Sequence, residues 1–207
     1  MSGRFISLEG GEGVGKSTQL ERLATALRER GFEVVETREP GGSPGAEAIR
    51  ALLLNGPGDR WTVEAEALLF AAARADHVAR TIRPALARGA WVLSDRFLDS
   101  SLAYQGVAGG LGEEALRRLH AIGSGGIMPD RTFLLRLPEA EAAARAATRD
   151  VEGADRIGAR DALYHRAVAA AFGALAVAEP DRIRILDARG CAGEVAERLL
   201  RELEDLM

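Results

Sequence analysis

The chain has a single cysteine, Cys191, and a single lysine, Lys16, although 27 of its 207 residues are basic. One cysteine cannot form an intramolecular disulfide bond, and it cannot supply a thiolate metal cluster. We interpret Cys191 as an inert thiol on or near a C-terminal helix. Long apolar runs are also missing, and residues 1–20 lack the layout of a signal peptide. These absences predict a cytoplasmic protein.

An excess of basic charge is missing as well, because the formal net charge is −4. Proteins that bind duplex nucleic acid usually carry clustered positive charge, so we expect neither nucleic acid nor a membrane as a partner. The hydrophobic fraction of 47% and the charged fraction of 28% are typical of a globular protein. The length fits one domain over residues 1–207.

Short apolar stretches alternate with helical patterns along the chain. Strands are predicted at 5–8, 32–36, 90–94, 132–137 and 182–186, and helices at 20–27, 64–88, 113–122, 139–148, 159–178 and 193–206. This alternation predicts an α/β fold: a five-stranded parallel sheet with helices on both faces and ligands outside the carboxyl ends of the strands. Segments 38–46 and 149–158 show neither pattern.

The first predicted strand leads into a loop that fits the phosphate-binding pattern G-x-x-x-x-G-K-[ST]. Its residues are Gly10, Gly11, Glu12, Gly13, Val14, Gly15, Lys16 and Ser17, and we assign Thr18 to the same ATP site. The glycines allow backbone N–H groups to surround a phosphate, and the following helix N-terminus adds partial positive charge. Lys16 can reach the β- and γ-phosphates, and Ser17 can ligate Mg²⁺. A glycine-rich turn without a ligand is the alternative, which the strand and helix on either side disfavour.

The apolar strand at 90–94 ends at Asp95 and Arg96. A carboxylate at this place can hold the hydration shell of Mg²⁺, and the neighbouring guanidinium can bind phosphate with two donors. The alternative is a helix-capping aspartate beside a surface arginine. Together with the phosphate loop, the pair predicts an enzyme that transfers a phosphoryl group from ATP to a small acceptor.

Five stretches of the chain resemble bacterial thymidylate kinases, members of the P-loop nucleoside-monophosphate kinases. They are residues 5–10 with the phosphate loop, Thr37-Arg38-Glu39-Pro40-Gly41-Gly42, residues 69–74, residues 94–106 with Asp95-Arg96 and Ala103-Tyr104-Gln105-Gly106, and Asp155-Arg156-Ile157. The resemblance implies transfer of the ATP γ-phosphate to dTMP, giving dTDP, with Mg²⁺ and in a homodimer. Gly158 and Arg136 depart from the usual pattern of that family.

The resemblance also implies an acceptor site made of Arg38, Glu39, Pro40, Phe70, Arg74, Arg96, Ser101, Tyr104 and Gln105. In it Phe70 stacks on the thymine and Arg74 hydrogen-bonds the base edge. Their spacing of four residues puts both on one helical face. Taken alone, a phenylalanine on such a helix is more often a core residue, because aromatic side chains are usually buried.

Further roles come from the resemblance alone. Arg38 and Arg96 hold the acceptor phosphate, and Ser101 faces the base. Tyr104 lies against the sugar at its 2′ carbon, which favours a deoxyribose. Glu12 lies near the 3′-hydroxyl of the acceptor.

The resemblance further implies that Glu39 helps to arrange metal and acceptor and that Pro40 shapes its loop. The family implies a small lid, at about 145–158 in this chain, which carries Arg145, Arg149 and Arg156. A lid arginine supplies positive charge to the transferring phosphoryl group when the phosphate loop is acidic. We assign this role to Arg149 and the ordering of the lid to Arg156, with a solvated helix face as the alternative for each.

Other P-loop proteins remain as competing interpretations. The first is a kinase for a deoxynucleoside or another monophosphate, which Phe70, Arg74 and Tyr104 disfavour. The second is a GTP-driven switch, but a guanine-binding Asn-Lys-x-Asp motif is impossible because the one lysine lies in the phosphate loop. The third is a P-loop fold kept only for assembly, which would be expected to lack part of the catalytic set.

Overall fold

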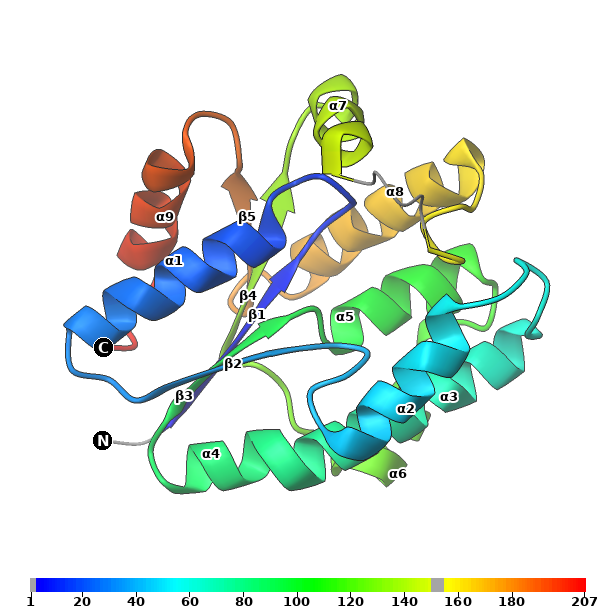
Figure 1. Ribbon diagram of the computed structural model, residues 1–207, viewed down its shortest axis with the longest axis horizontal. Helices are drawn as coiled ribbons and strands as arrows, with labels where there is room; N and C mark the ends of the chain where they lie inside the picture. The colour runs from blue at the N-terminus through cyan, green and yellow to red at the C-terminus, as the bar shows by residue number, and fades with distance from the viewer. Residues whose placement is uncertain (1–2, 150–154) are drawn as a thin grey trace.

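The computed structural model describes residues 3–149 and 155–207, and its five strands form one parallel sheet (Figure 1). The strands are β1 (Arg4–Glu9), β2 (Val34–Arg38), β3 (Trp91–Asp95), β4 (Arg131–Arg136) and β5 (Ile183–Asp187). Their order is β2-β3-β1-β4-β5, with Ile6 opposite Leu93 of β3 and Arg131 of β4. The predicted sheet is therefore confirmed. The bounds move by up to two residues, so that Arg38 ends a strand instead of opening a loop.

Helices cover both faces of the sheet, as predicted (Figure 1). On one face, α1 (Lys16–Glu29) and α9 (Ala192–Arg201) contribute Leu23, Leu27 and Leu199 to a core with Leu8 and Leu93. On the other face, α8 (Ala162–Ala178) contributes Phe172 and Leu175 to a core with Phe5 and Val92. Side chains that alternate along a strand point to opposite faces, which is why Phe5 and Leu8 belong to different cores.

The predicted long helix at 64–88 is wrong in its middle. It consists of α3 (Val63–His77), a π-helical turn η1 (Val78–Ile82) and α4 (Arg83–Ala87). Pro84 lies in the first turn of α4 and has no N–H to give to a carbonyl one turn earlier. A π-helical turn is one way in which a helix accommodates such a break.

Three helical segments are absent from the sequence prediction: α2 (Pro44–Leu54), α5 (Leu98–Ser101) and η2 (Leu102–Ala108). Ser43 caps α2 by accepting from the N–H of Ala46, and Pro44 occupies its first position. The remaining helices are α6 (Glu113–Ser124) and α7 (Glu139–Arg149), close to their predicted positions. The extent of the predicted lid stays a prediction, because residues 150–154 lie outside the described part of the chain.

Within residues 3–149 and 155–207, no helix is both long enough and apolar enough to cross a bilayer.

Candidate active site

The phosphate loop joins β1 to α1 and encloses the amine of Lys16. Nζ donates to the carbonyls of Gly10 (3.2 Å) and Gly11 (2.8 Å), and Lys16 is 8% exposed. Gly10 is required at its position, because its φ is +136° and an added Cβ would lie 2.6 Å from the carbonyl oxygen of Leu135. Burial, and secondly the nearby Arg96, lower the pKa of Lys16 to about 8. A bound phosphate would restore the charged form of this amine.

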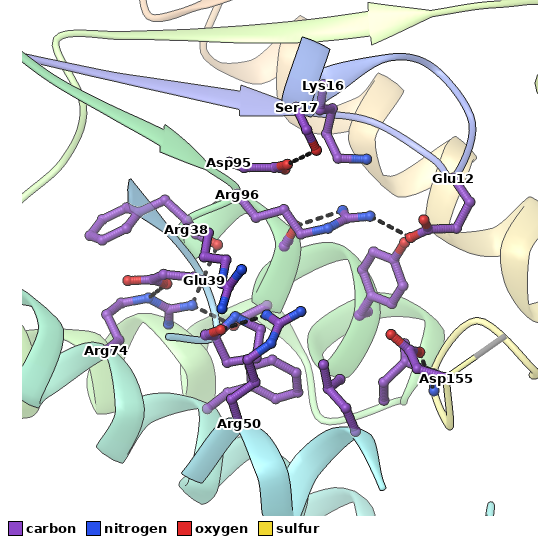
Figure 2. A pocket seen from close by; sticks show the side chains of 18 of the residues that line it. Glu12, Lys16, Ser17, Arg38, Glu39, Arg50, Arg74, Asp95, Arg96 and Asp155 are labelled. Atoms are coloured by element: carbon purple, nitrogen blue, oxygen red, sulfur yellow. Dashed lines mark hydrogen bonds and ion pairs between the residues drawn. The ribbon is translucent and has the colours of Figure 1, made fainter. Parts of the chain in front are cut away.

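Ser17 and Asp95 meet beside the loop, from the start of α1 and the end of β3 (Figure 2). The Ser17 hydroxyl donates to Asp95 Oδ2 over 2.8 Å. A hydroxyl and a carboxylate are hard oxygen donors, and Mg²⁺ usually keeps several waters and takes only one or two protein ligands beside substrate phosphates. The oxygen atoms of Ser17 and Asp95 are therefore suited to hold Mg²⁺, the role that the sequence predicts for them. Among the described residues, no three acidic, histidine or cysteine side chains form a larger metal cluster.

Arg96 follows Asp95 and adopts a left-handed backbone conformation, with φ at +71°. A non-glycine residue there is uncommon, and such strain tends to occur at functional sites. Its guanidinium donates to Glu12 (2.7 Å), to the Gly10 carbonyl (3.1 Å) and to Ser100 (3.1 Å). It also lies 5.4 Å above the ring of Tyr104. Four predicted site residues therefore converge from three separate segments.

Glu9, at the end of β1, supports the turn that carries Arg96. Its buried carboxylate accepts hydrogen bonds from the Phe97 N–H (2.8 Å) and the Ser100 hydroxyl (2.6 Å). Burial, and secondly the neighbouring Asp99, raise the pKa of Glu9 to about 7. The sequence prediction used Glu9 only as part of a motif and gave it no role.

A pocket of about 320 Å³ opens between the phosphate loop and helices α2 and α3 (Figure 2). All nine residues predicted for the acceptor line it: Arg38, Glu39, Pro40, Phe70, Arg74, Arg96, Ser101, Tyr104 and Gln105. Glu12, Lys16, Ser17 and Asp95 line it as well. We refer to it below as the acceptor pocket.

Phe70 and Arg74 lie on the face of α3 that borders the acceptor pocket. Phe70 is only partly buried and lines the pocket, which favours the base platform over the core interpretation. Arg74 is 3% exposed, and its guanidinium donates to Glu39 Oε2 (2.7 Å) and Ser101 Oγ (2.8 Å). Two hydrogen bonds, one of them also a buried ion pair, hold this side chain in a fixed orientation beside Phe70.

The carboxylate of Glu39 lies between Arg74 and His77. Its second oxygen accepts from His77 Nδ1 at 3.0 Å, and Nε2 of that ring lies 2.7 Å from Thr37 Oγ1. We therefore interpret Glu39 as a residue that orients Arg74, and its expected part in arranging metal and acceptor stays a prediction. Sequence reasoning missed His77, which is fully buried. Its place one helical turn after Arg74 was the available clue.

Two further cations border the acceptor pocket near β2. Arg38 donates to Glu47 (3.2 Å) but keeps 56% of its side chain exposed. Arg50, which was not predicted, donates to the Pro40 carbonyl at 2.6 Å (Figure 2). Burial, and secondly the neighbouring Arg38, lower the pKa of Arg50. Like charges held this close favour an anionic ligand between them.

Arg149 and Arg156 are the two lid arginines to which we assigned roles. Arg149 ends α7, and its side chain lies outside the described part of the chain. Arg156 is 4% exposed, and its guanidinium donates to Glu66 and to the carbonyls of Leu53 and Gly58. These contacts agree with an ordering role, and we do not expect Arg156 to contact the transferring phosphoryl group. Gln105 likewise donates its amide to Glu66, at 2.8 Å.

A second pocket of about 410 Å³ lies on the other side of the phosphate loop. It is lined by residues 13–15 and 17–19 of the loop and α1, by Arg145, and by Ala188, Gly190, Ala192 and Val195 around the turn from β5 to α9. Thr18 is an exposed residue in this wall. Sequence reasoning did not identify the part of this site that comes from the C-terminal turn. We refer to it as the donor pocket.

The comparisons with known proteins agree on one family. The sequence model of the family "Thymidylate kinase" matches residues 8–199. A thymidylate kinase of Rhizorhabdus wittichii is 63% identical over 207 residues, all of both chains, and one of Caulobacter vibrioides is 50% identical over 90% of this chain and 88% of its own length. The crystal structure of thymidylate kinase from Ehrlichia chaffeensis superposes with a TM-score of 0.78 at 27% identity, over 99% of this chain and 100% of that one. The chain belongs to the thymidylate kinase family.

Proposed function

We propose that this protein transfers the γ-phosphoryl group of ATP to dTMP and releases dTDP and ADP. The observation that carries the proposal is that one phosphate loop forms a wall of two pockets. The acceptor pocket has an aromatic platform, Phe70, beside the oriented guanidinium of Arg74. The donor pocket has room for the nucleoside part of ATP beside residues 13–18.

The chemistry asks the protein mainly for position and positive charge. A phosphate oxygen of the acceptor forms a bond to the γ-phosphorus of ATP, and the bond to the β–γ bridging oxygen breaks. Lys16 and Arg96 border the pocket at the phosphate loop, and Arg38 and Arg50 border it near β2. We assign the donor phosphates to Lys16 and the acceptor phosphate to Arg38, Arg50 and Arg96. When bound, Mg²⁺ would neutralise phosphate charge, with Ser17 and Asp95 holding it.

Tyr104 and Glu12 favour the deoxyribose of the acceptor. The Tyr104 ring is 6% exposed and packs edge-on against Phe172, so it forms a fixed wall of the acceptor pocket. A rigid wall at the 2′ carbon would exclude a ribose hydroxyl. Glu12 shares that pocket and is held by Arg96, which suits a carboxylate that accepts from the 3′-hydroxyl.

A coupled assay of ADP release tests the function directly. Purified protein is given ATP, Mg²⁺ and, one at a time, dTMP, dUMP, dCMP, dGMP or thymidine. We expect the largest kcat/KM with dTMP and no turnover of thymidine, which lacks the phosphate that Arg38 and Arg96 would bind. A preference for thymidine or for another monophosphate would contradict the proposal.

We also infer a homodimer. Helices α3 and α6 pack against each other, and each presents a large exposed apolar side chain: Leu68 is 55% exposed and Ile122 is 84% exposed. Exposed apolar side chains on neighbouring elements suit a protein interface. An interface on α3 would also buttress the helix that carries Phe70 and Arg74.

A further inference from the structure

Glu66 is a buried carboxylate that none of the roles above explains. It lies on α3, one helical turn before Phe70, and is 1% exposed. Its Oε1 accepts from Gln105 at 2.8 Å, and its Oε2 accepts from Arg156 and, at 2.7 Å, from Arg160. Burying a carboxylate is costly unless such donors satisfy it. Glu66 thus joins three segments that are distant in the sequence: α3, η2 and residues 155–160.

One of these partners, Arg156, makes three further hydrogen bonds with backbone carbonyls. Nε donates to the Leu53 carbonyl at 2.7 Å and Nη1 to the Gly58 carbonyl at 3.3 Å, while the backbone N–H of Arg156 donates to Leu54 at 3.2 Å. Its side chain has no exposed surface. A buried guanidinium needs a counter-charge, and Glu66 supplies it.

This ion pair places the residues on both sides of Arg156 in the wall of the acceptor pocket. Asp155 lines that pocket (Figure 2). Ile157 lines it too, as do Leu54 and Gln105, which the same network holds. Asp155 is in turn ordered by accepting from the N–H groups of Ile157 (2.9 Å) and Gly158 (2.8 Å). Glu66 and Arg156 themselves line neither pocket, and none of the four residues that they hold is among the described residues that line the donor pocket.

We propose that Glu66 is a positioning residue for the acceptor nucleotide, holding residues 155–157 and Gln105 as the wall of the acceptor pocket opposite the phosphate loop. The proposal rests on the proposed function, because it takes this pocket to be the dTMP site. It separates two roles of α3: Phe70 and Arg74 contact the base, and Glu66 fixes the segment that faces them. Acceptor binding should therefore depend on Glu66, and ATP binding should not.

The test is Glu66→Gln, which keeps the size of the side chain and removes the charge opposite Arg156. We expect the KM for dTMP to rise about tenfold or more and the KM for ATP to stay within about twofold. The matched control is Glu33→Gln, which removes a carboxylate from an exposed pair with Arg88, away from both pockets. In that control all constants should stay within about twofold.

A second pair of variants separates positioning from general stability. Arg156→Lys keeps a positive charge beside Glu66 but loses the guanidinium contacts with Leu53 and Gly58, so it should raise the dTMP KM less than Arg156→Gln does. In the double variant Glu66→Gln/Arg156→Gln, the rise should be smaller than the product of the two single effects, because both remove one interaction. If Glu66→Gln does not fold, the ordering of the two Arg156 variants decides.

A folded Glu66→Gln variant with the wild-type KM for dTMP would overturn the proposal. An equal rise in the KM for ATP would overturn it too, since that is a general loss and not a positional one. Thermal unfolding of each variant must lie well above the assay temperature. If the wild type fails to phosphorylate dTMP, the proposed function fails instead, so the two failures are distinguishable.

Discussion

At the scale of single residues, Arg96 combines an unfavourable backbone conformation with hydrogen bonds to three other residues of the site. Its φ of +71° costs an L-residue about 1–2 kcal/mol, which glycine does not pay. The contacts with Glu12, Ser100 and the Gly10 carbonyl fix its guanidinium beside the phosphate loop. The backbone conformation therefore favours glycine at position 96, whereas the contacts at the phosphate loop need arginine.

The comparison of Arg96→Gly with Arg96→Ala tests this conflict. Both variants should lose turnover by about a hundredfold or more, because each removes a charge that faces the phosphate site. Arg96→Gly should be about 1 kcal/mol more stable than Arg96→Ala, because only glycine adopts the left-handed conformation freely. Chemical denaturation gives the stabilities. Equal stability of the two variants would show that position 96 is not strained.

The lowered pKa of Lys16 predicts that the protein takes up protons when ATP binds. Its pKa of about 8 in the free protein should rise when anionic phosphates bind, because they favour the charged form. ATP binding at pH 8 should therefore take up about half a proton. Titration calorimetry in buffers with different ionisation enthalpies measures this number.

The control is Lys16→Arg, whose guanidinium stays charged at pH 8, so its ATP binding should take up no proton. Equal uptake by the variant and the wild type would assign the proton to another group.

At the scale of elements, helix α3 supplies four residues that form or support the acceptor pocket. Glu66, Phe70, Arg74 and His77 recur every three or four residues and lie on one helical face. The sequence predicted Phe70 and Arg74 through a motif. We did not identify Glu66 and His77 from the sequence, because their partners, Arg156 and Glu39, are far away in the chain and only the helical spacing pointed to them. Buried charge pairs become visible only when the fold brings the two charges together.

Phe70→Ala tests the role of α3 as a base platform. Loss of stacking on a base costs about 1–3 kcal/mol of binding free energy, so dTMP affinity should fall while ATP affinity stays unchanged. Calorimetric titration with each nucleotide measures both affinities. An equal fall in ATP affinity, or an unfolded variant, would assign Phe70 to the core.

Arg149, at the end of α7, and Arg156 have different expected roles. Arg149→Ala should lower kcat about a thousandfold and leave the dTMP KM nearly unchanged, because a charge donor acts mainly in the transition state. Arg156→Ala should lower kcat less and raise the dTMP KM more, given its contacts with Glu66 and Leu53.

Steady-state kinetics at saturating ATP check this ordering, with Arg88→Ala, from an exposed ion pair with Glu33, as the control. A larger loss of kcat at Arg156 would reverse the two assignments.

At the scale of the whole molecule, the order β2-β3-β1-β4-β5 explains why the site could be predicted so far. The carboxyl ends of β1, β2 and β3 meet at one edge, and these ends carry the phosphate loop, Arg38 and Asp95. Parallel strands with apolar runs have a clear sequence pattern. Helix η2 does not, because residues 102–106 are all buried and a helix buried all round has no amphipathic pattern. Helix α5 is only four residues long. The acceptor pocket and the phosphate-loop side of the donor pocket thus followed from motifs, whereas the side of the donor pocket that comes from the turn after β5 did not.

The proposed dimer belongs to this scale. The double variant Leu68→Glu/Ile122→Glu places charge on two exposed apolar positions of α3 and α6 and should shift the protein to a monomer. Sedimentation equilibrium measures the change. Val177→Glu, at a 79% exposed position of α8, is the matched control and should leave the association state as it is. A wild-type mass of one chain would refute the homodimer.

The single lysine also makes the phosphate loop chemically addressable. Reagents that modify primary amines have one side-chain target in this chain, Lys16, apart from the terminal amine. Reductive methylation with ¹³C-formaldehyde would therefore introduce one side-chain resonance, located between the carbonyls of Gly10 and Gly11. That resonance would report nucleotide binding without any assignment by mutagenesis. An arginine-rich, lysine-poor composition has thus left the nucleotide site as the one place where an amine label can attach to a side chain.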